Sequence, residues 1–185
     1  MRAFIAIEIP DAVKSGMADA QTRQRRAGVD AGWTRPEGIH LTLKFLGEIG
    51  DEQAQATLRA LTEGLGAAGS LQLGIEGVGT FPEARSARIV WVGLTGDVAR
   101  LAALQAAVER AAVDVGFEPE TRPFTPHLTL GRIKRIDDRA RWLKALEGLK
   151  DFKLPGFTVT SVSLMQSELR PAGAVYRQIG GVALG

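Results

Sequence analysis

The sequence contains no cysteine among its 185 residues. This absence excludes disulfide bonds, thiolate catalysis and cysteine-based zinc sites, and it fits a reducing, cytoplasmic location. Long apolar runs are missing as well, because stretches such as Ile89–Val92 are far too short to cross a bilayer. The N-terminal region lacks the pattern of a secretory signal. We therefore expect a cytoplasmic protein without membrane association.

A strong excess of charge of one sign is also absent. The net charge of +2 is too slight to indicate nucleic-acid binding by itself. The distribution of basic residues says more than the total. They cluster around two short segments of the chain, with Lys44 near the first and with Arg122, Arg132, Lys134 and Arg135 near the second.

Histidine is scarce, and its two copies occur in the same four-residue pattern, His40-Leu41-Thr42-Leu43 and His127-Leu128-Thr129-Leu130. Side chains alternate between the two faces of a strand. As strands, these segments would bury their leucines and present a histidine beside a threonine on the opposite face. Two such strands facing each other would combine two acid–base groups with two neutral hydrogen-bond donors.

The remaining pattern predicts a mixed α/β chain. Apolar runs with β-branched residues predict strands, and helical spacing between capping and glycine signals predicts helices. The expected strands cover residues 2–9, 39–46, 71–78, 88–94, 127–133, 157–165 and 174–179, and the expected helices cover 11–27, 51–65, 97–115 and 137–149. Residues between the first helix and the strand at 39–46 are expected to form a short connector.

The two halves of this order resemble each other. Each half has the predicted order helix, histidine strand, helix, strand, strand. The spacing from His40 to Ile75 equals that from His127 to Val162. An internal duplication is the economical explanation. We therefore expect one domain over residues 1–185, made of two pseudo-symmetric lobes, with a ligand site between them.

The paired histidines suit chemistry on a phosphodiester. One imidazole can accept a proton while the other donates one, and each act is typically worth 10²–10⁴-fold in rate. Threonine hydroxyls can donate to the phosphate oxygens. A lone histidine on a strand is more often structural, but two copies in matching places favour function. Zinc is disfavoured, because neither pattern contains Asp or Glu and no HExxH spacing occurs. We expect no metal and no cofactor.

These segments resemble the two signatures of the 2H phosphoesterases, and within them the RNA 2′,3′-cyclic phosphodiesterase branch, once called the 2′-5′ RNA ligase family. The resemblance rests on Trp33-Thr34-Arg35-Pro36-Glu37-Gly38-Ile39-His40-Leu41-Thr42-Leu43-Lys44-Phe45-Leu46-Gly47 and Arg122-Pro123-Phe124-Thr125-Pro126-His127-Leu128-Thr129-Leu130-Gly131-Arg132. The opening Arg2–Glu8, Phe81-Pro82, Arg88–Leu94 and Tyr176 fit the same branch. The resemblance spans essentially the whole chain.

The resemblance implies a bilobal α/β (α+β) fold, with two antiparallel sheets and outer helices around a central groove. It also implies hydrolysis of a terminal RNA 2′,3′-cyclic phosphate to a 2′-phosphomonoester. In the family the first histidine, here His40, protonates the leaving 3′-oxygen, and the second, here His127, activates water. Thr42 and Thr129 would hold the phosphate. The near symmetry of the halves means that the residues alone do not assign these two roles.

Four further residues are candidates for substrate binding. Strict alternation points Arg132 away from the site, so it binds phosphate only if a strand end or a bulge turns it toward the site. Alternation gives Lys44 the correct side to line the groove. Phe81 and Tyr176 either stack on a base or pack as core or rim aromatics.

Several functions remain open at this stage. The same site can join RNA ends through a 2′-5′ linkage, although water favours hydrolysis. The chain can instead be a non-catalytic module that binds RNA ends, or an enzyme of small cyclic nucleotides. The expected partners are RNA ends, tRNA fragments among them, or small nucleotides, and a monomer is expected. No nucleotide-triphosphate loop is present, so ATP-driven ligation is not supported.

Overall fold

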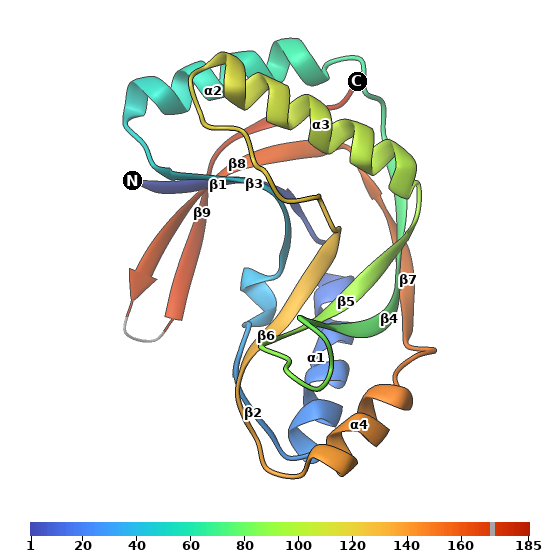
Figure 1. The fold of residues 1–185 in the computed structure, drawn as a ribbon. Helices are drawn as coiled ribbons and strands as arrows, with labels where there is room; N and C mark the ends of the chain where they lie inside the picture. The colour runs from blue at the N-terminus through green and yellow to red at the C-terminus, as the bar shows by residue number, and fades with distance from the viewer. Residues whose placement is uncertain (171–172) are drawn as a thin grey trace.

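The computed structural model describes residues 1–170 and 173–185, which form two antiparallel sheets with helices packed on them (Figure 1). The strands are β1 (Arg2–Glu8), β2 (Val29–Trp33), β3 (His40–Glu48), β4 (Leu71–Phe81), β5 (Ile89–Gly96), β6 (His127–Ile136), β7 (Lys153–Val159), β8 (Ser161–Arg170) and β9 (Gly173–Ala183). The helices are α1 (Asp11–Arg26), α2 (Asp51–Leu65), α3 (Val98–Asp114) and α4 (Arg139–Glu147), and a short 3-10 turn, η1 (Pro36–Gly38), precedes β3.

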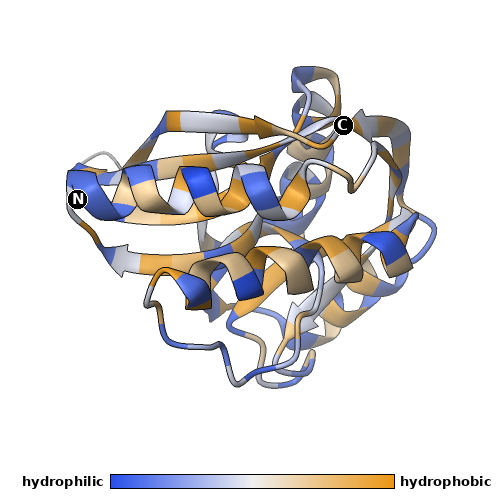
Figure 2. Cartoon of the chain, turned by 90° about the horizontal axis from the view of Figure 1, so that it is seen from above, coloured by the Kyte–Doolittle hydropathy of each residue, from blue (hydrophilic) through white to orange (hydrophobic). Residues whose placement is uncertain are grey.

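The first sheet has the strand order β3-β1-β8-β9, and the second has the order β2-β6-β5-β4-β7. Helices α2 and α3 pack on the first sheet, whereas α1 and α4 pack on the second (Figure 1). Seen from above in Figure 2, hydrophilic and hydrophobic segments alternate along the two helices nearest the viewer. That pattern is typical of helices with one face on a core. The face of each sheet opposite its helices is called the helix-distal face below.

The main apolar core lies between the sheets and their helices. The five central residues of β1 are buried because both faces of the strand are covered. Ala3, Ile5 and Ile7 point into the main core, whereas Phe4 and Ala6 belong to a small cluster on the helix-distal face, completed by Met165 and Tyr176. β1 therefore places an apolar floor directly beside the strand that carries His40. Among the described residues, none of the helices is long and apolar enough to cross a membrane.

Most predicted elements are present, but two regions differ. Residues 29–33, expected to form a connector, are strand β2, which pairs with the distant strand β6. The strand predicted over residues 157–165 is two strands in different sheets. Phe157 and Val159 are buried in one sheet and Val162 and Leu164 in the other. The alternation changes phase between Val159 and Val162, because the chain changes sheets there.

The two histidine strands occupy equivalent places. β3 pairs with β1, the strand before α1, and β6 pairs with β5, the strand before α3. β4 follows β3 in the chain but joins the sheet of β6, and β8 joins the sheet of β3, whereas β7, which lies between β6 and β8 in the chain, stays in the sheet of β6. The repeated unit therefore begins one strand earlier than the sequence pattern suggests, and the halves are interleaved. Duplication as the origin of this arrangement stays a prediction.

Candidate active site

His40 and Thr42 lie on the helix-distal face of the first sheet. Residues directly opposite each other on antiparallel strands share a face. His40 lies opposite Glu8 and Thr42 lies opposite Ala6, a member of the helix-distal cluster. Leu41 points into the main core. The alternation predicted for this segment is confirmed.

His127 and Thr129 have the equivalent position in the second sheet. His127 lies opposite Gly93 and Thr129 opposite Trp91, whereas the alternating residues Leu128 and Leu130 are fully buried in the main core. Both histidines therefore stand on a strand whose other face anchors it in the core. A backbone held in this way fixes the direction of the side chains that it presents.

A β-bulge interrupts both strands just after the threonine. The register skips Leu43 opposite β1 and Leu130 opposite β5. A bulge adds one residue and reverses the alternation beyond it. Each skipped residue has a carbonyl that accepts a hydrogen bond from a glutamine side chain, from Gln105 of α3 to Leu43 at 3.3 Å and from Gln21 of α1 to Leu130 at 2.9 Å. The Leu130 carbonyl also accepts from the Thr34 backbone N–H at 2.9 Å, so helix side chains and, in the second strand, neighbouring backbone satisfy the carbonyls at the bulges.

The second bulge turns Arg132 to the face that carries His127. Arg132 lies opposite Ile89, and Ile89 alternates with the fully buried Val90. The arginine side chain is exposed and therefore lies on the helix-distal face. The bulge that a phosphate-binding role requires is present, and the role itself stays a prediction.

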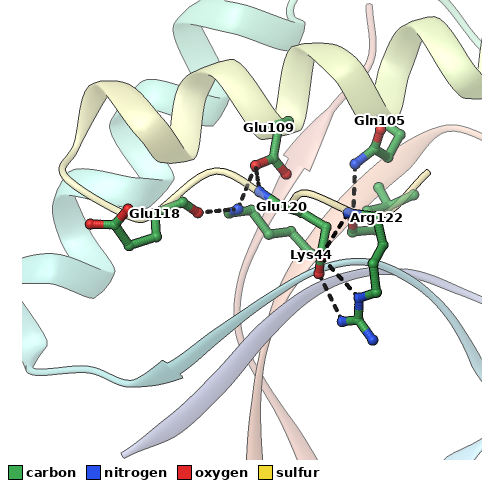
Figure 3. Close-up of polar contacts among 7 residues, drawn as sticks. Lys44, Gln105, Glu109, Glu118, Glu120 and Arg122 are labelled. Atoms are coloured by element: carbon green, nitrogen blue, oxygen red, sulfur yellow. Dashed lines mark hydrogen bonds and ion pairs between the residues drawn. The ribbon is translucent and has the colours of Figure 1, made fainter. Parts of the chain in front are cut away.

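The first bulge has the opposite effect on Lys44, for which the predicted side is wrong. Lys44 lies opposite the core residue Ile5, and its side chain is only 4% exposed. Its Nζ donates to Glu109 Oε1 at 2.6 Å and to the Glu118 carbonyl at 2.9 Å (Figure 3). The same bulge brings Phe45 to the helix-distal face, where it is 65% exposed. Lys44 is therefore not placed to line the site, and Phe45 occupies that side instead.

His40 is enclosed by aromatic rings. The Phe4 and Tyr176 ring centroids lie 4.5 and 4.9 Å from the imidazole centroid. Burial is the main cause that lowers the pKa of His40 to about 4, and the charge of Lys14 lowers it further. A hydrogen bond with the Gly38 backbone and the charge of Glu8 act in the opposite direction. His40 is consequently neutral at pH 7 in the free protein.

His127 has a similar but distinct environment. Its Nδ1 lies 2.7 Å from the Thr125 carbonyl oxygen, and the Phe81 ring meets the imidazole edge-on at a centroid distance of 4.9 Å. A carbonyl oxygen only accepts hydrogen bonds, so this contact assigns the proton of the neutral ring to Nδ1. Nε2 is then the atom available for proton transfer. The backbone partner stands two residues before the histidine, as Gly38 does for His40.

The structure places the two predicted aromatics against the histidines, one on each. Tyr176 contacts His40, and Phe81 contacts His127 and also lies 5.0 Å from Trp91 between ring centroids. These contacts make both rings part of the walls around the imidazoles. Their stacking on a base stays a prediction. Phe45 is more exposed on this face than Tyr176 or Phe81. Strict alternation would place Phe45 on the opposite face, so it was not predicted as a site residue.

A polar group beside His40 was missed by sequence reasoning. Glu8 Oε1 accepts hydrogen bonds from Ser163 Oγ at 2.6 Å and from Gln178 Nε2 at 3.2 Å. Gln178 also donates to Ser163 Oγ at 2.8 Å. Glu8 lies directly opposite His40, so this network fixes a carboxylate next to the imidazole. Its members come from both ends of the chain, and no local pattern links them.

Comparisons with known proteins agree with this arrangement. The family model described as "2'-5' RNA ligase superfamily" matches residues 10–170. The chain belongs to this superfamily, the 2H phosphoesterases. This membership places it among the phosphodiesterases, a class of hydrolases.

Relatives and solved structures match nearly the whole chain. An RNA 2',3'-cyclic phosphodiesterase of Methanothermobacter thermautotrophicus is 31% identical over 95% of this chain and 95% of its own. That of Methanocaldococcus jannaschii is 30% identical over 97% and 98%. A solved protein of Thermus thermophilus aligns with a TM-score of 0.80 at 24% identity over 100% and 98%. E. coli LigT complexed with NADP+ aligns with a TM-score of 0.73 at 26% identity over 99% and 96%. The predicted family and fold class are confirmed.

Proposed function

We propose that this 2H phosphoesterase hydrolyses RNA 2′,3′-cyclic phosphate ends to 2′-phosphomonoesters through acid–base catalysis by His40 and His127. The observation that carries the proposal is the matched setting of the two histidines. Each has a backbone partner two residues before it and a threonine two residues after it on the same face. The names of the relatives support this class of substrate.

The proposed reaction needs one proton accepted and one donated. One imidazole removes a proton from the attacking water, and the other protonates the departing 3′-oxygen. Thr42 and Thr129 donate hydrogen bonds to the non-bridging oxygens, and Arg132 neutralises the charge that develops on them. β3 and β6 are in contact, which supports the action of both histidines on one phosphate.

The low pKa of His40 sets a condition on its role. A proton donor must be protonated, yet His40 carries a proton in only ~10⁻³ of free molecules at pH 7, given a pKa of about 4. A bound phosphate anion stabilises the imidazolium and raises this pKa. In the proposed mechanism His40 therefore takes up its proton together with the substrate, and His127, with Nε2 unprotonated, serves as the base.

Catalysis without a metal ion is part of the proposal. The two histidines supply the proton transfers, and the two threonines and Arg132 supply the charge stabilisation that a metal ion would otherwise provide. In addition, residues 1–170 and 173–185 contain no cluster of three His, Asp or Glu side chains close enough to hold a metal ion. Activity in the presence of a chelator is therefore expected.

The test is incubation of the purified protein, in EDTA, with a short RNA that ends in a 2′,3′-cyclic phosphate. The products are identified by mass and chromatography, beside His40→Ala and His127→Ala. Conversion to the 2′-phosphate by the wild type and its loss in both variants is expected. Intact RNA binding without turnover, unaffected by either substitution, would instead identify a binding module. Turnover of mononucleotides alone would change the substrate and retain the mechanism.

The assignment of acid and base needs a second substrate. In a cyclic phosphorothiolate the 3′-oxygen is replaced by sulfur, which departs without a proton. The variant that lacks the acid should then regain most of its rate, whereas the variant that lacks the base should not. We expect recovery in His40→Ala. Recovery in His127→Ala would exchange the two roles. Adding a 5′-hydroxyl RNA in excess to the same assay tests whether the site also forms a 2′-5′ linkage.

A further inference from the structure

A buried ion pair connects the strand of one histidine to the loop of the other. Lys44, on β3, donates to Glu109 of α3 and to the Glu118 carbonyl in the loop between α3 and β6 (Figure 3). The Lys44 side chain is 4% exposed and that of Glu109 is 20% exposed. Water therefore has little access to either charge, and the geometry of the pair is held by its protein partners.

The same carboxylate oxygen also binds the loop directly. Glu109 Oε1 accepts a hydrogen bond from the Glu120 backbone N–H at 2.8 Å. The Glu120 side chain in turn accepts bonds from the backbone and side chain of Arg122 at 3.0–3.1 Å. Lys44 and Glu109 thus hold the loop at residues 118 and 120. The hydrogen bonds from Arg122 to Glu120 continue these loop contacts to residue 122.

The loop ends at the second histidine. Thr125, just before β6, supplies the carbonyl that lies 2.7 Å from His127 Nδ1 and assigns its proton. A shift of the loop would move this carbonyl, and the imidazole would then lose the contact that fixes its ring and its tautomer. Among the described residues, Thr125 is the one backbone partner of His127 Nδ1.

We propose that Lys44 is a positioning residue, which holds the loop that orients His127 and thereby couples the two histidine strands. Gln105 of α3 adds to this coupling, because it binds the bulge carbonyl of Leu43 directly before Lys44. The bulge in β3 thus directs Lys44 away from the substrate and toward the loop. For its effect on turnover, this inference rests on the proposed function.

The first variant is Lys44→Met, which keeps an unbranched side chain up to the ε position and removes all its donors. Glu109 Oε2 is already buried without a partner among the described residues, so the lost ammonium leaves a poorly compensated carboxylate. Lys44→Met/Glu109→Met removes both charges and the loop contact together. Glu109→Gln is the conservative variant, because its amide oxygen still accepts from Lys44 and Glu120. Leu61→Ala, a cavity in the fully buried part of α2, serves as the matched destabilised control.

Two measurements test the proposal at a temperature where all variants are folded. In Lys44→Met and in the double variant, kcat on the cyclic phosphate should fall at least tenfold with KM changed less than threefold. Glu109→Gln should keep kcat within about threefold, and Leu61→Ala should keep it too. Loss of kcat in Leu61→Ala equal to that in Lys44→Met would overturn the proposal, because general destabilisation would then explain both.

The second measurement does not depend on turnover. Nitrogen-15 NMR distinguishes the imidazole tautomers, and with two histidines the spectrum is assigned by comparison with His40→Gln. The wild type should show His127 with the proton on Nδ1, and Lys44→Met should show a mixture. An unchanged His127 spectrum in both lysine variants would overturn the proposal. An inactive wild type with the expected spectral change would contradict the proposed function and leave the positioning role supported.

Discussion

The unusual acidity of His40 predicts how the stability of the protein depends on pH. In the native state burial lowers the pKa of His40 from 6.5 to about 4. Below pH 6.5 the unfolded chain therefore binds a proton that the native state does not bind, and stability decreases as the pH falls. The loss relative to pH 7 should reach about 2 kcal/mol at pH 5 and about 3 kcal/mol at pH 4, then level off below the native pKa.

Urea unfolding of the wild type and of His40→Gln between pH 4 and pH 7 measures this loss. Carboxylates titrate in both proteins, so the difference between the two free energies of unfolding isolates the histidine. We expect the wild type to lose about 3 kcal/mol relative to the variant over this range. A difference that stays constant within about 0.5 kcal/mol, the error of such extrapolations, would refute the argument from burial.

Three further substitutions test the helix-distal face. Arg132→Ala should lower kcat on the cyclic phosphate about 100-fold, or ~3 kcal/mol, and Arg132→Lys should restore part of it. An unchanged kcat in Arg132→Ala would show that Arg132 does not bind the phosphate. Phe45→Ala should weaken binding of an RNA end by ~1–3 kcal/mol in a titration, as expected for loss of one stacked base, whereas Leu169→Ala, exposed on the β8–β9 hairpin, should not. Gly38→Ala would place a Cβ 3.0 Å from Tyr176 Cε2 and displace the ring. Because the displaced ring should admit water to His40, the pKa of His40 should rise toward its ordinary value in an NMR titration. A pKa still near 4 would show that Tyr176 does not exclude water.

Local patterns predicted the elements well. The helix expected over residues 51–65 is α2, with the predicted ends, and both histidine strands begin close to their expected positions. Apolar periodicity reports which face of an element is buried, and this information is contained in neighbouring residues. By contrast, β2 is a strand because it pairs with β6 across more than half of the chain. Its five residues do alternate, with Val29, Ala31 and Trp33 on the core side, but a run this short beside a glycine predicts a connector.

The side-chain directions beyond the threonines show the limit of the same reasoning. Alternation predicted that Lys44 faces the site and that Arg132 faces away from it. A single skipped residue in each strand reverses both directions. The carbonyls at the bulges accept hydrogen bonds from glutamines of helices that lie far away in the sequence. The family resemblance favoured Arg132 on the side of the site, which alternation allows only with a strand end or a bulge before it. The residues of the strand alone contain no comparable signal.

The equivalence of the two strands also indicates where the halves of the site diverge. Beyond the bulges, Lys44 of β3 corresponds to Gly131 of β6, and Phe45 corresponds to Arg132. At the first pair the side chain points toward the core. Lys44 binds the loop there, whereas a Cβ at Gly131 would lie only 3.0 Å from the ring of Trp33, so that side accommodates no longer group.

At the second pair the side chain lies on the helix-distal face. An exposed ring beside His40 suits a base, and a guanidinium beside His127 suits a phosphate. The same bulge in both strands thus places two different kinds of side chain on the helix-distal face. In the proposed function they would meet the two ends of a nucleotide. The direction in which the RNA lies across the site should follow from this pair. Exchanging Phe45 and Arg132 in a double variant should therefore impair turnover more than either alanine substitution, although both residue types remain present.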